Sequence, residues 1–173
     1  MDPIALTTTL VRIDSRNPAL APDGPGEGTC VRALRDILDA QGFRTEILEG
    51  TPGRPSLVAR IGSGSGRSVM LNGHVDTVQT EGMTHAPFSA EQRDGKLWGR
   101  GAADMKGGVA AMCAAAARAH AQGALHGEVI LTAVADEEWG SIGTREVIAR
   151  GIRADAVVVT EPTDLTVAPA HKG

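Results

Sequence analysis

The sequence predicts an α/β domain whose mixed, largely parallel sheet carries helices on both faces. Three observations favour this fold class. Short, continuously apolar runs, typical of strands buried on both faces, alternate with helical patterns along the chain. The composition of the 173 residues, 42% hydrophobic and 22% charged, suits one globular domain. Acidic residues follow several of the apolar runs, and in such sheets ligands collect at the carboxyl ends of strands.

The first third of the chain predicts two helices and then two strands. Apolar residues at helical spacing indicate a helix over 4–13, and residues 29–41 form the clearest amphipathic helix, which a glycine ends. Alternating residues predict strands at 43–48 and 56–61. The Gly/Ser run 62–66 that follows predicts a hairpin turn; no phosphate-binding sequence accompanies it.

The remainder of the chain alternates strands with helices, and no internal repeat interrupts it. Strands are predicted at 69–71, 96–99, 128–135, 154–159 and 165–170, and helices at 107–122 and 141–150.

Composition excludes several classes of function. The net charge is −4, only 2% of the residues are aromatic and Tyr is absent, so neither a basic stripe nor stacking platforms for nucleic acid are expected. No apolar run approaches the ~20 residues of a membrane helix, and no secretory signal is visible, so a cytoplasmic location is expected. Cys30 and Cys113 are interpreted as small buried hydrophobic residues rather than a disulfide framework.

One histidine and several carboxylates lie where predicted strands end or in an adjoining loop. These residues are His74, Asp76, Asp104, Glu137, Glu138 and Glu161. Massed carboxylates repel one another and cost desolvation energy, so a bound cation is the simplest reason to gather them. An imidazole in the set favours zinc over calcium or magnesium. The sequence also lacks the two-histidine helix motif of mononuclear zinc proteases.

Two close pairs carry most of this prediction. In an extended segment His74 and Asp76 point the same way, so the carboxylate can hold one imidazole nitrogen while the other nitrogen meets a metal. Glu137 and Glu138 leave a strand on different sides, so one can bind metal while the other acts as general base. The alternatives are a hydrogen-bonded histidine near a turn and an exposed helix start with Asp136 as its N-cap.

The other two acids are weaker signals when each is taken alone. Asp104 lies in a loop of small residues between Gly101 and Gly108, which lets the backbone approach a bound object closely. The alternative is that Asp104 caps the helix that follows. Glu161 precedes Pro162 at the end of a strand.

Taken together and in this order, these segments resemble the cocatalytic dizinc amidohydrolases, a family that includes acetylornithine deacetylase, succinyl-diaminopimelate desuccinylase, aminoacylase and glutamate carboxypeptidase. The motifs are Gly73-His74-Val75-Asp76-Thr77-Val78, the segment 99–108 around Asp104, and Asp136-Glu137-Glu138. Glu161-Pro162-Thr163 is similar to the deacetylase and desuccinylase branch. The resemblance implies a zinc-peptidase-like catalytic domain.

The resemblance also implies a role for each site residue. His74 would bind one zinc ion, Asp104 would bridge two ions, and Glu138 and Glu161 would complete the ligands, with their division between the ions left open. Cobalt or manganese could replace zinc. Asp76 would orient His74, and Glu137 would be the general base that activates a water for attack on an amide.

Members of the family continue through a lid or dimerisation domain and then return to the catalytic domain with a further zinc-binding histidine. Residues 1–173 are therefore expected to be the N-terminal part of the catalytic metal-binding domain, with the lid and the return segment absent. None of the remaining histidines, which include His85 and His171, fills that gap. Apolar surface beside the last strand is expected to be exposed, and the isolated chain to be weakly active or inactive.

The implied function is hydrolysis of the amide bond of N-acyl amino acids or small peptides, by a full-length form that dimerises through its lid. Two alternatives remain. One is a non-catalytic metal-binding or interaction module on the same fold, although such a module has no use for a base at Glu137. The other is a related zinc aminopeptidase.

Overall fold

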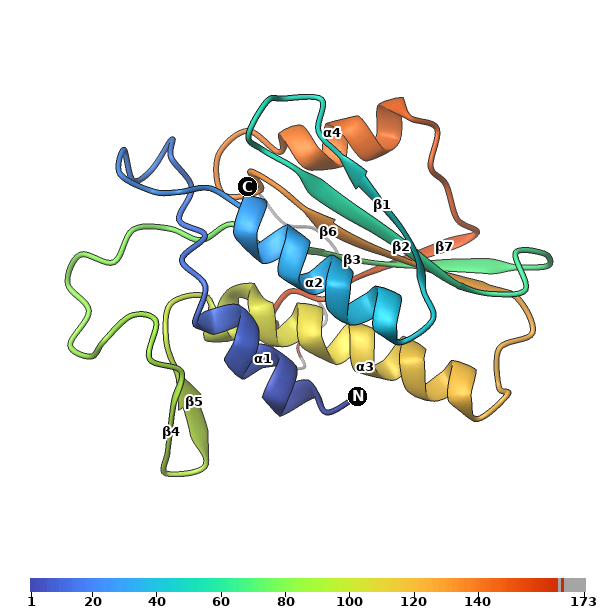
Figure 1. Cartoon of the computed structure of the whole chain (residues 1–173), viewed down its shortest axis with the longest axis horizontal. Coiled ribbons are helices and arrows are strands. Elements are labelled where there is room, and N and C mark those ends of the chain that lie inside the picture. The colour runs from blue at the N-terminus through green and yellow to red at the C-terminus, as the bar shows by residue number, and fades with distance from the viewer. Residues whose placement is uncertain (165, 167–173) are drawn as a thin grey trace.

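The computed structural model describes residues 1–164 and Thr166, and its main sheet has five strands in the order β1-β2-β6-β3-β7 (Figure 1). These strands are β1 (Arg44–Leu48), β2 (Ser56–Gly62), β3 (Ser68–His74), β6 (Glu128–Val134) and β7 (Ala156–Val159). Strand β2 is antiparallel to both of its neighbours, whereas β3 is parallel to β6 and to β7. Four of the five strands therefore run in one direction, which confirms the mixed, largely parallel sheet.

Helices cover both faces of this sheet, as the sequence predicts (Figure 1). They are α1 (Pro3–Val11), α2 (Gly28–Ala40), α3 (Gly107–Ala121) and α4 (Ile142–Ala149). Successive residues of β2 separate the two faces, because Leu57 belongs to the core under α1, α2 and α3, whereas Val58 packs with Val147 of α4. No described helix has the length and hydrophobicity needed to cross a bilayer.

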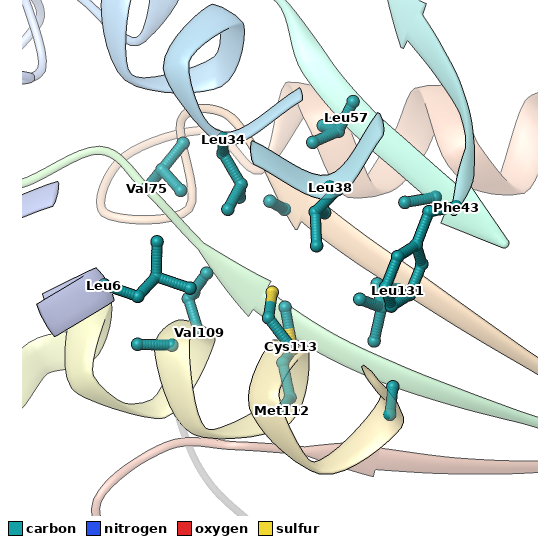
Figure 2. Close-up of a cluster of buried hydrophobic side chains, with 14 of the residues drawn as sticks. Leu6, Leu34, Leu38, Phe43, Leu57, Val75, Val109, Met112, Cys113 and Leu131 are labelled. Carbon is teal, nitrogen blue, oxygen red and sulfur yellow. The ribbon is translucent and has the colours of Figure 1, made fainter. Parts of the chain in front are cut away.

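The larger core fills the space between the first three helices and the sheet (Figure 2). Leu34 and Leu38 of α2 are fully buried there, close to residues of α3. Cys30 and Cys113 lie in the same core as free, buried thiols, so the prediction for both cysteines is confirmed.

The predicted hairpin at 62–66 is wrong, because β6 lies between β2 and β3. Strand β6 is apolar, with six of its seven residues buried, and it occupies the centre of the sheet. The segment that connects β2 to β3 must therefore cross the first residues of β6. Glycine permits that crossing. Gly62 has a φ of 116°, and a Cβ added there would lie 2.2 Å from the carbonyl oxygen of Gly127.

The remaining elements lie outside the main sheet. Residues predicted as a strand at 96–99 form β5 (Lys96–Trp98), which pairs with β4 (Glu91–Arg93) in a separate hairpin. A short kinked segment, η1 (Ala102–Lys106), precedes α3, and the backbone of Asp104 and Met105 within it is not helical. Except for Thr166, the predicted strand 165–170 lies outside the described residues, and so does His171. Apolar surface is exposed on β7, where Val157, Val158 and Val159 are each about half exposed.

A buried lysine joins η1 to the end of α1. The Nζ atom of Lys106 donates hydrogen bonds to the carbonyl oxygens of Leu10 and Ile13, at 3.0 and 2.9 Å. Leu10 lies in the last turn of α1 and Ile13 just after the helix, a region where carbonyl oxygens lack the usual helical donors. Burial lowers the pKa of Lys106. The contact fixes the loop that carries Asp104 against the rest of the domain.

Close packing of α3 on the chain after β7 gives a test of the fold. A Cβ at Gly108 would lie 2.3 Å from the carbonyl oxygen of Thr160. Gly108→Ala is therefore expected to lower the free energy of unfolding by about 1–3 kcal/mol, because backbone must move to admit the methyl group. Urea denaturation measures this change.

Gly28→Ala is the matched control, because a Cβ there meets only the flexible guanidinium of Arg32 within 3.4 Å. Unchanged or increased stability is expected for this variant, since Ala favours a helix over Gly by up to ~1 kcal/mol. Equal denaturation midpoints for the two variants would contradict the packing described here.

Candidate metal centre

The carboxyl ends of β6, β3 and β7 lie side by side because these strands are parallel neighbours. His74 is the last residue of β3 and pairs in register with Val134, the last residue of β6. The Glu137-Glu138 pair follows β6, and Glu161 follows β7. Asp104 comes from η1, which is not part of the sheet.

The imidazole of His74 lies at the centre of the acidic residues. Its Nε2 atom is 3.1 Å from Asp104 Oδ1, 3.6 Å from Glu161 Oε1 and 3.7 Å from Glu137 Oε2. Ligand atoms of His74, Asp104 and Glu138 lie within 4.8 Å of one another, and so do those of His74, Glu137 and Glu161. The structure therefore offers two overlapping sets of metal ligands that share one histidine.

Asp76 lies behind His74 and is fully buried. Its Oδ1 atom is 3.5 Å from His74 Nδ1, and the hydrogen bond of Nδ1 goes to the backbone oxygen of Asp76 at 3.0 Å. The carboxylate accepts hydrogen bonds from the backbone N–H groups of Glu137 and Glu138, at 3.0 and 3.2 Å. Once the Nε2 proton is lost, the proton kept on Nδ1 would leave the lone pair of Nε2 directed at the acids, as a metal ligand requires.

The two capping alternatives do not describe this site. Helix α3 has no side-chain hydrogen bond at its N-cap, and Asp104 instead bonds to His74. Asp136 has a φ of 63° and accepts a hydrogen bond from the N–H of Gly140, so it closes a turn that ends before α4. Glu137 and Glu138 fall into different ligand sets, as expected for adjacent residues that leave a strand.

The charges of the site favour a bound cation. Burial lowers the pKa of His74, but hydrogen bonds to Asp104 and Asp76 and nearby negative charge outweigh this and raise it to about 11. Burial and the charges of Asp104, Asp76 and Glu137 raise the pKa of Glu138 to about 7, against the opposing charge of His74. Burial and neighbouring acids also raise the pKa of Glu161.

The positive charge of protonated His74 thus partly neutralises the surrounding carboxylates, as a bound cation would. Among the described residues, His74 is the sole ion-pair partner of Asp104, Glu137 and Glu161. An imidazole nitrogen together with several carboxylate oxygens is a donor set that suits zinc and related divalent ions. The residues present therefore fit a metal, and a divalent ion would compensate the acids more fully than one proton does.

Sequence reasoning missed four residues behind the site: the buried Asn17, Glu27 and Lys106, and the partly buried Arg54. Asn17 is part of the segment that precedes Pro18, which indicates only the end of the first helix. Arg54 and Glu27 lie in loops or next to them and follow no periodic pattern.

Comparison with known proteins identifies the family. Residues 70–171 match the sequence model of peptidase family M20/M25/M40. The chain belongs to this family. It is 41% identical over 172 residues to a succinyl-diaminopimelate desuccinylase of Paracoccus denitrificans, covering 94% of this chain and 43% of the relative. It is 40% identical over 172 residues to the enzyme of that name from Gluconobacter oxydans, with the same coverage. The chain thus spans less than half the length of these M20 relatives.

Solved structures share the fold, and they include peptidases of the M20 family. A metallo-carboxypeptidase from Sulfolobus solfataricus matches with a TM-score of 0.80 at 23% identity, over 92% of this chain and 37% of that one. Human carnosine dipeptidase 1 matches with a TM-score of 0.72 at 25% identity, over 91% of this chain and 38% of the dipeptidase chain. A dinuclear metal binding peptidase from Bacillus subtilis matches with a TM-score of 0.63 at 19% identity, over 91% of this chain and 41% of the peptidase chain. The family and the fold class that the sequence motifs predict are confirmed.

Metal loading of this M20 chain is expected to release protons. At pH 7 the His74 imidazole is protonated, because its pKa is about 11, and Glu138 is about half protonated, because its pKa is about 7. Since metal ligands must be deprotonated, zinc binding should release about one proton per chain or more. The apparent zinc affinity should therefore rise with pH. Calorimetric titration with zinc in buffers of different ionisation enthalpy measures the released protons. An observed heat that is identical in all buffers would contradict this charge state.

Proposed function

We propose that this chain carries metal ligands and the general base of an M20 hydrolase that cleaves the amide bond of N-acyl amino acids. The observation behind the proposal is the convergence of His74, at the end of β3, with acids that follow the parallel neighbours β6 and β7 and with Asp104 of η1. The names of the desuccinylase relatives make N-succinyl-diaminopimelate the first substrate to test.

In this proposal His74 Nε2 and the carboxylates of Asp104, Glu138 and Glu161 hold a pair of divalent ions. Asp104 lies 3.1 Å from His74 Nε2 and has 58% of its side chain accessible, so it would hold metal together with His74. Ions bound there would supply an activated water and polarise the amide carbonyl. Zinc is the first choice for such ligands, and cobalt and manganese are the alternatives to test.

Glu137 is assigned the role of general base. Its carboxylate is 43% exposed, so it can face solvent and an entering substrate. It would accept the proton of the attacking water and return it to the leaving nitrogen. Asp76 would orient the His74 imidazole and stabilise its Nδ1–H tautomer. In this proposal, attack of water on the amide carbonyl depends on Glu137, whereas metal binding depends on His74 and the carboxylates of Asp104, Glu138 and Glu161.

A comparison of two isosteric variants tests these roles. Glu138→Gln is expected to lower zinc affinity by roughly 10–100-fold because a ligand is removed. Glu137→Gln should keep the metal content of the wild type and lower any zinc-dependent hydrolysis by about 100-fold or more, because only the base is lost. Metal analysis after gel filtration, zinc titration and amine release from N-succinyl-diaminopimelate provide the measurements.

The comparison also separates the alternatives. Loss of an ion in Glu137→Gln would make Glu137 a ligand, which its place beside His74 and Glu161 would allow. Unchanged hydrolysis in that variant would refute the catalytic role. Preference for substrates with a free α-amine over N-acyl substrates would favour an aminopeptidase. The isolated chain is expected to turn over slowly at most, and rapid turnover would contradict that expectation.

A further inference from the structure

A buried network of polar side chains lies directly behind the candidate metal ligands. It consists of Asn17, Glu27, Arg54 and Asp136, and is called the support network below. Asn17 and Glu27 are fully buried, Asp136 is 3% exposed, and the side chain of Arg54 is 14% exposed. The network contacts Asp76, which in turn holds the backbone of Glu137 and Glu138.

Asn17 connects two carboxylates that would otherwise repel each other. Its Nδ2 atom donates hydrogen bonds to Asp76 Oδ2 at 2.8 Å and to Asp136 Oδ1 at 2.9 Å. Its Oδ1 atom accepts hydrogen bonds from Arg54 at 3.1 Å and from the backbone of Ala19 at 3.0 Å. An amide is the side chain that can donate twice and accept twice at one place, and here both functions are used in full.

Arg54 supplies the positive charge of the support network. Its guanidinium forms a two-bond pair with Glu27, at 2.6 and 2.8 Å, and donates to Asp136 at 3.1 Å. Glu27 also accepts a hydrogen bond from the backbone N–H of Asp136, at 3.2 Å. Such charge-assisted pairs are strong and geometrically specific, because the planar guanidinium fixes the position of both oxygens.

The consequence of these contacts is a turn that is held at several points. Asp136 accepts a hydrogen bond from Gly140, which closes the turn that contains Glu137 and Glu138. Asp76 binds the backbone N–H groups of those two residues, and Asn17 binds both Asp76 and Asp136. The position of both glutamates relative to His74 is thus set by side chains that contribute no ligand atom.

We propose that Asn17, supported by Arg54, is a positioning residue that sets the distance of the Glu137-Glu138 turn from His74 and thereby the metal affinity of the site. This inference rests on the proposed function, because it assumes that the site binds a divalent ion. Partners of metal-ligating groups typically change metal affinity by 10–100-fold when they are removed.

Zinc titration of Asn17→Leu in the 173-residue chain tests the inference. The variant keeps a similar side-chain volume and removes both donors, and its zinc affinity should fall by roughly 10–100-fold. Asn72→Leu is the matched control. Asn72 lies on β3, two residues before His74, and its Oδ1 accepts a hydrogen bond from Thr132 at 2.7 Å, outside the support network. Zinc affinity should stay unchanged in the control.

Asn17→Asp separates positioning from simple electrostatic attraction. The added carboxylate brings negative charge to the acidic site, so through-space attraction alone would tighten zinc binding. Loss of the donor would instead weaken binding, and weaker binding is the expected result. Arg54→Lys gives a milder perturbation in case the Asn17 variants do not fold. It keeps the charge but cannot match the two-bond geometry, and its zinc affinity should fall by about 10-fold or less.

Amide hydrogen exchange in the metal-free chain gives a readout that needs no metal. Exchange at the backbone N–H groups of Glu137 and Glu138 should accelerate by about 10-fold or more in Asn17→Leu. Arg54→Lys takes the place of this variant if Asn17→Leu does not fold. Exchange should not accelerate in the control, Asn72→Leu. Wild-type chain that binds no zinc, with accelerated exchange in the variant, would refute the proposed function and retain the structural part of the inference. Unchanged zinc affinity and unchanged exchange would overturn the inference and leave the proposed function intact. Tighter zinc binding by Asn17→Asp would also overturn it.

Discussion

The parallel pairing of β3 with β6 on one side and β7 on the other is the constraint on which the site depends. Parallel neighbours end at the same edge of a sheet, so residues 60 and more positions apart in the sequence meet there. His74 ends β3, the middle one of these three strands, and the acids after β6 and β7 flank it. Asp104 completes the cluster from η1, which Lys106 fixes to the end of α1. The sheet order thus brings His74, the Glu137-Glu138 turn and Glu161 to one edge, and η1 adds Asp104 to them.

Electrostatics explains why so many acids can share this edge. Asp76 is fully buried as a carboxylate, and its hydrogen bonds from Asn17, from backbone N–H groups and with His74 lower its pKa despite burial. Asp104 is stabilised in the same way by His74, and its pKa is also lowered. Glu138 and Glu161 accept no hydrogen bond from an N–H group among the described residues, and burial together with neighbouring acids raises their pKa values against the opposing charge of His74. The site therefore divides into acids that the protein itself compensates and acids that need a cation from outside.

Local sequence patterns predicted the strands and the residues at their ends, because an apolar run and the polar residue after it are adjacent in the chain. The order of strands is a long-range property, and the hairpin predicted at 62–66 was wrong because β6 takes the place between β2 and β3. The support network could not be predicted for the same reason. Asn17 lies 59 positions from Asp76 and 119 positions from Asp136. Lys106 was missed because a lysine is normally exposed, and the carbonyl oxygens of Leu10 and Ile13 that accept its hydrogen bonds are distant in the sequence.

Anomalous diffraction at the zinc edge, from crystals of the chain grown with zinc, tests the central claim most directly. The account predicts two peaks roughly 4 Å apart at the edge formed by β6, β3 and β7, one within bonding distance of His74 Nε2 and both within reach of Asp104. The absence of anomalous density around His74 at saturating zinc would contradict the account. So would zinc that is bound only at surface residues away from His74.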